Sequence, residues 1–114
     1  MRIYNSTRGT ELARDARAAR TFWSRFTGLM GRPALPPGEA LVLEPCSSVH
    51  TAFMRFAIDV VYTDRSWRVV KVCSNLKPFR ASGVLRGGYA AIELASGTIA
   101  ASGTALGDQL VFED

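Results

Sequence analysis

The sequence has little of the chemistry on which catalytic and metal-binding motifs usually depend. Its 114 residues include one histidine and two cysteines. Two cysteines do not make the disulfide framework of a small secreted domain, so we expect reduced thiols. A blue-copper site needs a second histidine, which the chain lacks. We therefore expect no metal and no cofactor.

Long apolar runs are also missing. No run approaches the roughly 20 residues that span a bilayer, and residues 1–9 contain no apolar leader segment. We therefore expect a cytoplasmic protein without membrane contact. The hydrophobic fraction of 47% and charged fraction of 21% are those of an ordinary globular protein. At this length we expect a single domain over residues 1–114.

Positive charge is concentrated at the amino-terminal end. Residues 1–32 hold seven arginines against two acids, a net charge of +5, whereas residues 33–114 carry a net charge of −1. Such a segment could attract nucleic acid, membrane phosphates or acidic metabolites. No zinc finger, helix-turn-helix or aromatic-interleaved basic motif accompanies the charge. A solvated face is therefore the better interpretation, and nucleic acid is not the expected partner.

Hydrophobic periodicity predicts an α+β fold in which strands dominate. Apolar residues recur at steps of four and three from Leu12 to Met30, which predicts one main helix over residues 15–29. Ser96-Gly97-Thr98 predicts a short helical turn that Gly103 ends. The expected strands are 2–5, 10–13, 40–44, 57–63, 67–73, 89–94 and 109–112, with a hairpin around residues 64–66. Together they predict a compact antiparallel sheet, barrel-like, of five to seven strands.

The unusual chemistry lies between Cys46 and Asp59. Cys46, His50 and Met54 are spaced four apart, which would place them on one face of a helix or strand. A zinc site formed by Cys46, His50, Asp59 and Cys73 is chemically possible, but no short paired ligand motif supports it. A Cys46 nucleophile with His50 as base is another alternative. In an extended strand, however, the two would be about 13 Å apart.

Two carboxylates interrupt apolar strands. Asp59 lies in FAIDVVY and Glu93 in AIEL. Burial of an unpaired carboxylate costs several kcal/mol, roughly, so Asp59 needs a donor. That need is met either by a structural ion pair or capped turn, or within a polar pocket. Arg55 could fork onto a carboxylate or phosphate, or stack on an aromatic ring.

The order of several segments is similar to that of a known family. GLMGR at 28–32, MRFAIDV at 54–60 and ELASG at 93–97 occur in that order, with His50 between the first two. In this respect the chain resembles the bacterial and archaeal domain-of-unknown-function 192 family. The resemblance implies a β-rich domain with a small helical element and no established activity. Ala57 stands where the family usually has proline, which implies a backbone role for that position.

These observations support two functional hypotheses. The first is a non-enzymatic small-ligand-binding or accessory domain that takes a saccharide or an anionic metabolite. The second is a hydrolase or transferase in which His50 is a general base oriented by Asp59 or Glu93. The candidate ligand-binding residues are Arg25, Arg32, His50, Met54, Arg55 and Asp59.

Overall fold

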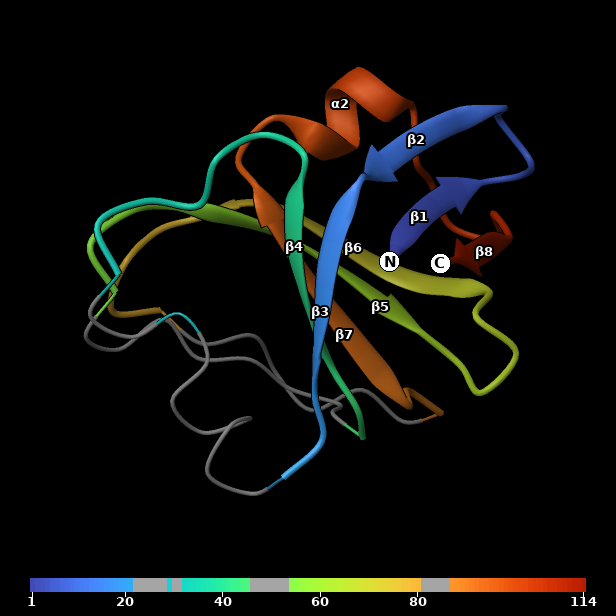
Figure 1. Cartoon of the computed structure of the whole chain (residues 1–114), viewed down its shortest axis with the longest axis horizontal. Helices are drawn as coiled ribbons and strands as arrows, with labels where there is room; N and C mark the ends of the chain where they lie inside the picture. Colours follow the sequence, from blue (N-terminus) through green and yellow to red (C-terminus); the bar gives the residue numbers. More distant parts are fainter. Residues whose placement is uncertain (22–28, 30–31, 46–53, 81–86) are drawn as a thin grey trace.

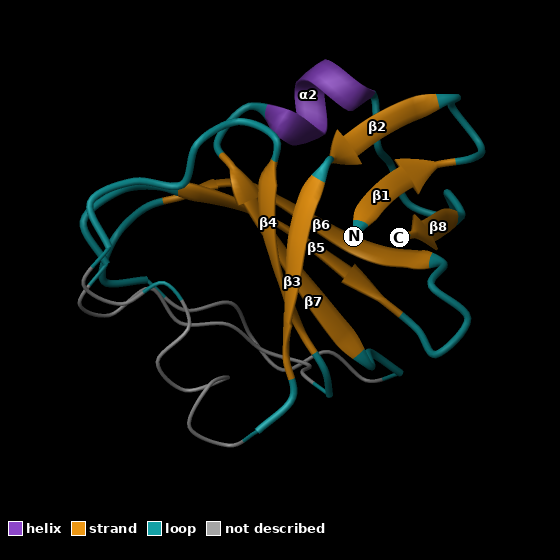
Figure 2. Ribbon diagram, in the orientation of Figure 1, coloured by secondary structure: helices purple, strands orange, loops and turns teal. Residues whose placement is uncertain are grey.

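The computed structural model of the chain describes residues 1–21, 29, 32–45, 54–80 and 87–114. These residues form eight strands in two sheets and one short helix beside strand β2 (Figures 1 and 2). The elements are β1 (Arg2–Asn5), β2 (Thr10–Ala13), β3 (Asp15–Ala19), β4 (Glu39–Leu43), β5 (Ile58–Thr63), β6 (Val69–Leu76), β7 (Ala90–Ala95), α2 (Thr98–Ser102) and β8 (Leu110–Glu113). The five-residue helix is too short to cross a bilayer, and no other described helix could do so.

The two sheets are open rather than closed into a barrel. The smaller sheet has the order β2-β1-β8, which brings the two ends of the chain together, and the larger has the order β3-β4-β7-β5-β6. A single bridge, Arg68 to Gln109, links the hairpin region to the segment before β8. The expected barrel-like sheet of five to seven strands is therefore corrected to eight described strands in two open sheets. The dominance of strands is confirmed.

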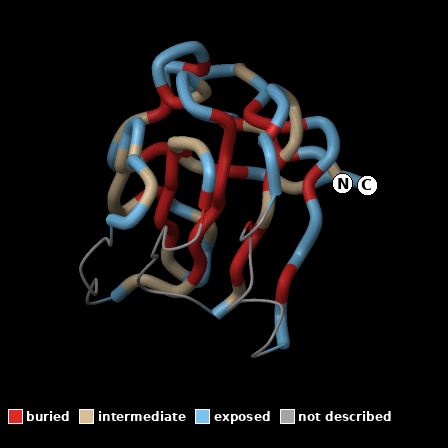
Figure 3. The backbone as a smooth tube through the Cα atoms, turned by 90° about the vertical axis from the view of Figure 1, so that its left-hand side faces the viewer, coloured by how far each residue is buried: buried red, intermediate tan, exposed pale blue. Residues whose placement is uncertain are grey.

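Both faces of the larger sheet are covered. All six residues of β5 and all six of β7 are buried, and Figure 3 shows this buried centre. One face packs against the smaller sheet and α2 through Ile3, Leu12, Val42, Val61, Ile92, Leu94, Ile99 and Leu110. The other face forms a second cluster with Leu29, Leu35, Leu43, Met54, Ile58, Val60, Tyr62 and Ala91. Burial on both faces explains why β5 and β7 are nearly continuous apolar runs.

The predicted main helix is wrong where the structure describes it. Residues 15–19 form strand β3, which pairs in parallel with β4 from Asp15 opposite Glu39 to Ala19 opposite Leu43. Ala16 and Ala19 are buried and Ala18 is exposed, so the strand imitates the three-residue spacing of a helix face. Pairing with β4 overrides the high intrinsic helix propensity of the alanines and the arginine in this segment, because tertiary context outweighs propensity. Residues 22–28 of the predicted helix lie outside the described residues.

The predicted hairpin and helical turn are confirmed. β5 pairs with β6 in antiparallel register, and the Oδ1 of Asp64 accepts the turn amides of Ser66 at 2.9 Å and Arg68 at 3.0 Å. Helix α2 ends at Gly103, which adopts a left-handed φ of 72°. No local side chain caps the start of α2, so its first amides must be satisfied from elsewhere in the fold.

Candidate functional site

Two buried carboxyl groups occupy adjacent central strands. Asp59 on β5 is 1% exposed and Glu93 on β7 is 2% exposed. Glu93 pairs with Val60, the residue after Asp59, so the two side chains project from opposite faces of the sheet. They therefore cannot act together as an acid/base pair.

Asp59 ties three parts of the chain together. Its Oδ1 accepts the amide of Asn75 at 2.9 Å, and its Oδ2 accepts the amides of Gly97 at 3.1 Å and Ile99 at 2.8 Å. Gly97 has a φ of 96°, a conformation that suits glycine. The carboxylate thus supplies the missing cap of α2 and holds the end of β6 against β5. Its need for donors is met by backbone amides, which corresponds to the capped-turn alternative.

Glu93 has no comparable support. Its Oε1 is buried and makes no hydrogen bond with any residue that the structure describes. Burial raises the pKa of the Glu93 carboxyl to about 8, so the group carries its proton at neutral pH. Buried polar groups in native proteins are almost always hydrogen-bonded, and an exception requires a reason. A buried acid with a strongly shifted pKa is a candidate functional group.

The surroundings of Glu93 are mainly apolar. We call this surface of the larger sheet, together with the side chains packed on it, the Glu93 face. Strand alternation and the second hydrophobic cluster give its members as Glu93, Leu35, Leu41, Leu43, Met54, Ile58, Val60, Tyr62 and Cys73. Tyr62 and Cys73 are titratable members of this face, and Cys73 is a free, half-buried cysteine. Lys71 pairs with Tyr62, and its Nζ lies 5.6 Å from the centre of the Tyr62 ring. The face therefore surrounds one buried acid with packed apolar side chains.

The predicted site residues are divided by the fold. Met54 is buried within the Glu93 face, whereas the carboxylate of Asp59 points to the opposite side of the sheet. Arg32 is exposed, with its Nη2 3.4 Å from the Oε1 of Glu39, and Arg55 is also exposed. Arg25 and His50 lie outside the described residues, as does Cys46. The sequence signal for Glu93 was a carboxylate in an apolar strand, the same signal that identified Asp59.

The described residues offer no metal site. No three His, Cys, Asp or Glu side chains within them lie close enough to hold an ion. Asp59 and Cys73 belong to opposite faces of the larger sheet, since Cys73 pairs with Val60 and packs with the second cluster. These two candidate zinc ligands therefore do not converge.

Two surface depressions lie away from the Glu93 face. One, of about 480 Å³, is lined by residues of both chain ends and of β3. The other, of about 430 Å³, lies between β2, the Pro37–Gly38 turn and α2. Neither depression is lined by any of the six predicted site residues.

A second polar cluster joins β1, the β1–β2 turn and the segment after α2. The Oδ2 of Asp108 accepts hydrogen bonds from Arg8 Nε, Asn5 Nδ2 and the amide of Ala105, each at 2.9 Å. Asn5 also donates to the Thr104 hydroxyl at 3.1 Å. Asp108 is 3% exposed, and its bonds from Arg8 and then Asn5 lower the pKa of the carboxyl to about 2. The described donors to Asp108 make these hydrogen bonds within the cluster, which indicates a structural role for Asp108.

The Asp108 cluster predicts a stability that depends on acid pH. The pKa of Asp108 is lower in the folded than in the unfolded state, so its contribution is complete above about pH 4 and is lost as the pH falls towards 2. Asp108→Asn should lower the free energy of unfolding at pH 7 by roughly 1–3 kcal/mol. Urea denaturation should show that the difference in the free energy of unfolding between wild type and Asp108→Asn becomes smaller at pH 2.5. Asp114→Asn, at an exposed position, is the control. A gap that stays constant with pH would contradict this role.

Comparison with known proteins gives a consistent set of relatives. The model of DUF192, described as Uncharacterized ACR, COG1430, matches residues 3–112. A UPF0127 protein of Pyrococcus furiosus is 38% identical over 111 residues, which cover 95% of each chain. A UPF0127 protein of Thermococcus sibiricus is 30% identical over 115 aligned positions, covering 97% of this chain and 74% of that protein.

Two solved structures share the fold. A protein of unknown function from Novosphingobium aromaticivorans superposes with a TM-score of 0.81, covering 97% of this chain and 82% of that chain. A putative transcription regulator from Sinorhizobium meliloti gives a TM-score of 0.78, covering 96% and 89%. Both are 18% identical to this chain, a level at which the similarity concerns the fold alone.

Proposed function

The chain belongs to the DUF192 (UPF0127) family, and we propose that it is a small-ligand-binding or accessory domain in which Glu93 anchors the ligand. The observation that carries the proposal is the Glu93 Oε1, which is buried without a hydrogen bond to any described residue. A ligand that offers a hydrogen-bond partner to this carboxyl would compensate its burial. Folding alone provides no described hydrogen bond that offsets the free-energy cost of burying the Glu93 carboxyl.

The chemistry of the site suggests the class of ligand. A protonated carboxyl donates one hydrogen bond and can accept others, which suits a hydroxyl or a carboxylate on the ligand. Met54 and the aliphatic residues of the Glu93 face would contact its apolar parts. In this proposal the exposed Arg32 and Arg55 would contact an anionic substituent of the ligand, for which guanidinium groups are suited, and Arg25 and His50 remain further candidates. A saccharide or an anionic metabolite meets these requirements.

A thermal-shift screen tests this proposal. The panel contains monosaccharides, sugar acids, carboxylates and phosphates, and the proteins are wild type, Glu93→Leu and Glu11→Leu. Glu11 is exposed on β2 and serves as the matched control. A ligand that stabilises wild type and Glu11→Leu should bind Glu93→Leu about tenfold or more weakly, because its partner in the buried site is gone. Equal binding to all three proteins would exclude Glu93 as the anchor.

A second candidate function uses the same carboxyl for catalysis. A pKa of about 8 keeps Glu93 protonated at neutral pH, as a general acid requires. In this hydrolase or transferase hypothesis His50 is the base, and Glu93 is its acidic partner. Glu93→Gln would then retain ligand binding and lose turnover. Loss of binding without any product formation by the wild type would favour the binding function.

A further inference from the structure

A groove runs along α2, at the end of the molecule where β2 and the turn before β4 come close to the helix (Figure 2). The depression of about 430 Å³ between β2, the Pro37–Gly38 turn and α2 is joined there by a smaller one of about 230 Å³, which is lined by Pro37 and by residues 95–98 and 101. The two depressions adjoin, because Pro37, Thr98 and Ala101 line both of them. We call the two together the α2 groove.

Arg14 is the cation that lines the α2 groove, and Gly38 fixes its position. The Gly38 carbonyl accepts the backbone amides of Arg14 at 2.9 Å and Asp15 at 3.0 Å. A Cβ atom added at Gly38 would lie 3.3 Å from the Cζ and 3.4 Å from the Nε of Arg14, so the guanidinium packs against the Gly38 backbone. Gly38 also has a φ of 93°, which residues with a side chain rarely adopt. The backbone and the guanidinium of Arg14 are therefore both held, which lowers the entropy cost of binding a ligand.

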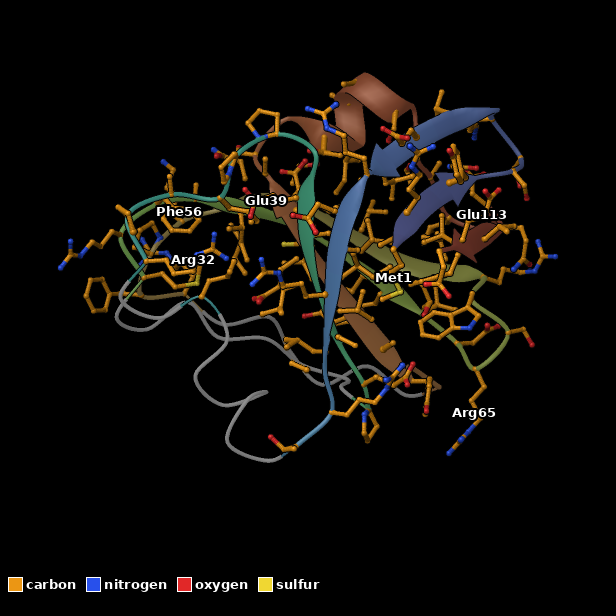
Figure 4. All side chains as sticks on the ribbon, in the orientation of Figure 1. Met1, Arg32, Glu39, Phe56, Arg65 and Glu113 are labelled. Carbon is orange, nitrogen blue, oxygen red and sulfur yellow. The ribbon has the colours of Figure 1, made fainter. Side chains whose placement is uncertain are left out.

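The described residues do not neutralise the charge of Arg14. None of the ion pairs between them includes Arg14. Glu39, which follows Gly38 and is labelled in Figure 4, pairs instead with Arg32 at 3.4 Å. The guanidinium of Arg14 is therefore available to an anion that enters the groove.

Glu11 limits the charge that such an anion can carry. Its residue lines the same depression as Arg14, and its charge also acts on the exposed Arg2. The pKa of the Arg2 guanidinium is raised by the hydrogen bond to Tyr4 and the charge of that residue, and then by the charge of Glu11. A second negative charge on a ligand would be repelled by Glu11. A singly charged anion therefore suits the groove better than a phosphate dianion.

Hydrogen bonds hold the walls of the α2 groove in place. The Thr10 hydroxyl donates to the carbonyl of Ser102 at 2.7 Å and so joins β2 to α2. The Thr98 hydroxyl donates to the carbonyl of Ala95 at 2.7 Å and so fixes the turn between β7 and α2. The smaller depression has short apolar side chains, those of Pro37, Ala95 and Ala101. The groove therefore places an apolar section beside one cation.

We propose that the α2 groove is a binding site for a small monocarboxylate with an apolar substituent. The guanidinium of Arg14 donates a pair of parallel hydrogen bonds to the carboxylate, the geometry for which its planar fork is suited. The apolar substituent lies over Pro37, Ala95 and Ala101. The larger depression, of about 430 Å³, has the size of a small-molecule site.

This site is separate from the ligand site proposed at Glu93. The residues that line the α2 groove do not include any member of the Glu93 face. Glu93→Leu should therefore bind a groove ligand as wild type does, and Arg14→Gln should leave a Glu93 ligand unaffected. The two proposals can fail independently.

Amide NMR titrations of the isotope-labelled full chain test the proposal. The probes are acetate, butyrate and hexanoate, with butylamine and inorganic phosphate as the comparison compounds. Hexanoate should bind with a Kd of about 1–10 mM and shift the amides of Gly38, Thr98 and Ala101. Each CH₂ group that the groove covers should tighten binding about two- to fourfold, so hexanoate binds more tightly than acetate. Arg14→Gln should weaken binding of hexanoate about tenfold or more.

Matched variants separate the groove from general surface effects. Ala100 and Ala101 are both exposed on α2, but only Ala101 lines the groove. Ala101→Leu should fill the apolar section and weaken hexanoate binding about tenfold, whereas Ala100→Leu should bind as wild type does. Arg17 is exposed on β3 and does not line the groove, so Arg17→Gln is the charge control for Arg14→Gln. Circular dichroism establishes that each variant is folded.

Four results would overturn the proposal. The first is the absence of a saturable response to hexanoate up to about 50 mM, a high concentration even for a ligand of so few atoms. The second is unchanged binding to Arg14→Gln, and the third is an equal loss in the Ala100 and Ala101 variants. The fourth is that butylamine or inorganic phosphate binds in the groove more tightly than hexanoate, which would assign the site to another class of ligand.

Discussion

Asp59→Ala should destabilise the fold by about 3–5 kcal/mol. The carboxylate is 1% exposed and accepts the amides of Asn75, Gly97 and Ile99. Alanine would leave the buried amide of Ile99 without a partner, and it would remove the acceptor of the part-buried amides of Asn75 and Gly97. It would also release the start of α2 and the end of β6 from β5. Urea denaturation at pH 7 measures the change.

Asp64→Ala is the matched control for Asp59→Ala. Asp64 also accepts two backbone amides, those of Ser66 and Arg68, but in an exposed turn. Water can replace the carboxylate there, so the expected loss is about 1 kcal/mol or less. Similar losses for the two variants would contradict the view that Asp59 is a buried clamp. Asp59→Asn should fall between them, because its amide oxygen can still accept.

Glu93→Gln should change the pH dependence of the free energy of unfolding. At pH 8 the free energies of wild type and variant should differ by up to a few kcal/mol. The pKa of Glu93 is raised from 4.5 in the unfolded state to about 8 in the folded state. Between these values the folded protein holds a proton that the unfolded chain has lost. Stability therefore falls as the pH rises from about 4.5 to 8 and levels off above. The slope contributed by this group is at most about 1.4 kcal/mol per pH unit.

Urea midpoints of wild type and Glu93→Gln between pH 5 and 8.5 measure this effect. Glutamine resembles the protonated acid in shape and charge, so the two proteins should be nearly equal at pH 5. The variant should become the more stable protein as the pH rises. Tyr62 and Cys73 also belong to the Glu93 face. Their contributions are present in both proteins and cancel in the difference. Parallel pH curves would rule out a buried ionisable Glu93.

Such a gain in stability would also bear on function. A residue that destabilises the folded protein and can be replaced with benefit is a poor structural element. Native chains keep such residues where a ligand or a reaction uses them. A Glu93 variant that is more stable than wild type and no longer binds the ligand would show that this side chain lowers stability and serves binding. The Asp59 and Glu93 carboxyls, similar in sequence context, would then have opposite roles.

Much of the strand pattern could be predicted from the sequence. The apolar runs that became β4, β5 and β7 were identifiable because strands buried on both faces need apolar residues at successive positions. The β5–β6 hairpin followed from the turn at Asp64, and the end of α2 followed from Gly103. The family assignment followed from the order of the segments GLMGR, MRFAIDV and ELASG along the chain, and comparison with relatives confirmed it.

Residues 15–19 could not be assigned correctly from periodicity. Ala16 and Ala19 are small enough for either a helix face or a strand edge, and their spacing favours the helix. Only the presence of β4 alongside, a partner about 24 positions further along the chain, makes the strand the better solution. Non-local pairing of this kind leaves no local signal.

The sequence by itself determined that two acids interrupt buried strands, and that each must be compensated or costly. It could not determine which of the two acids would be compensated, because the donors to Asp59 are backbone amides and every residue type except proline carries one. The tertiary structure decided this by bringing α2 and the end of β6 to one face of the larger sheet. The opposite face received apolar side chains, and Glu93 lies among them without a described partner.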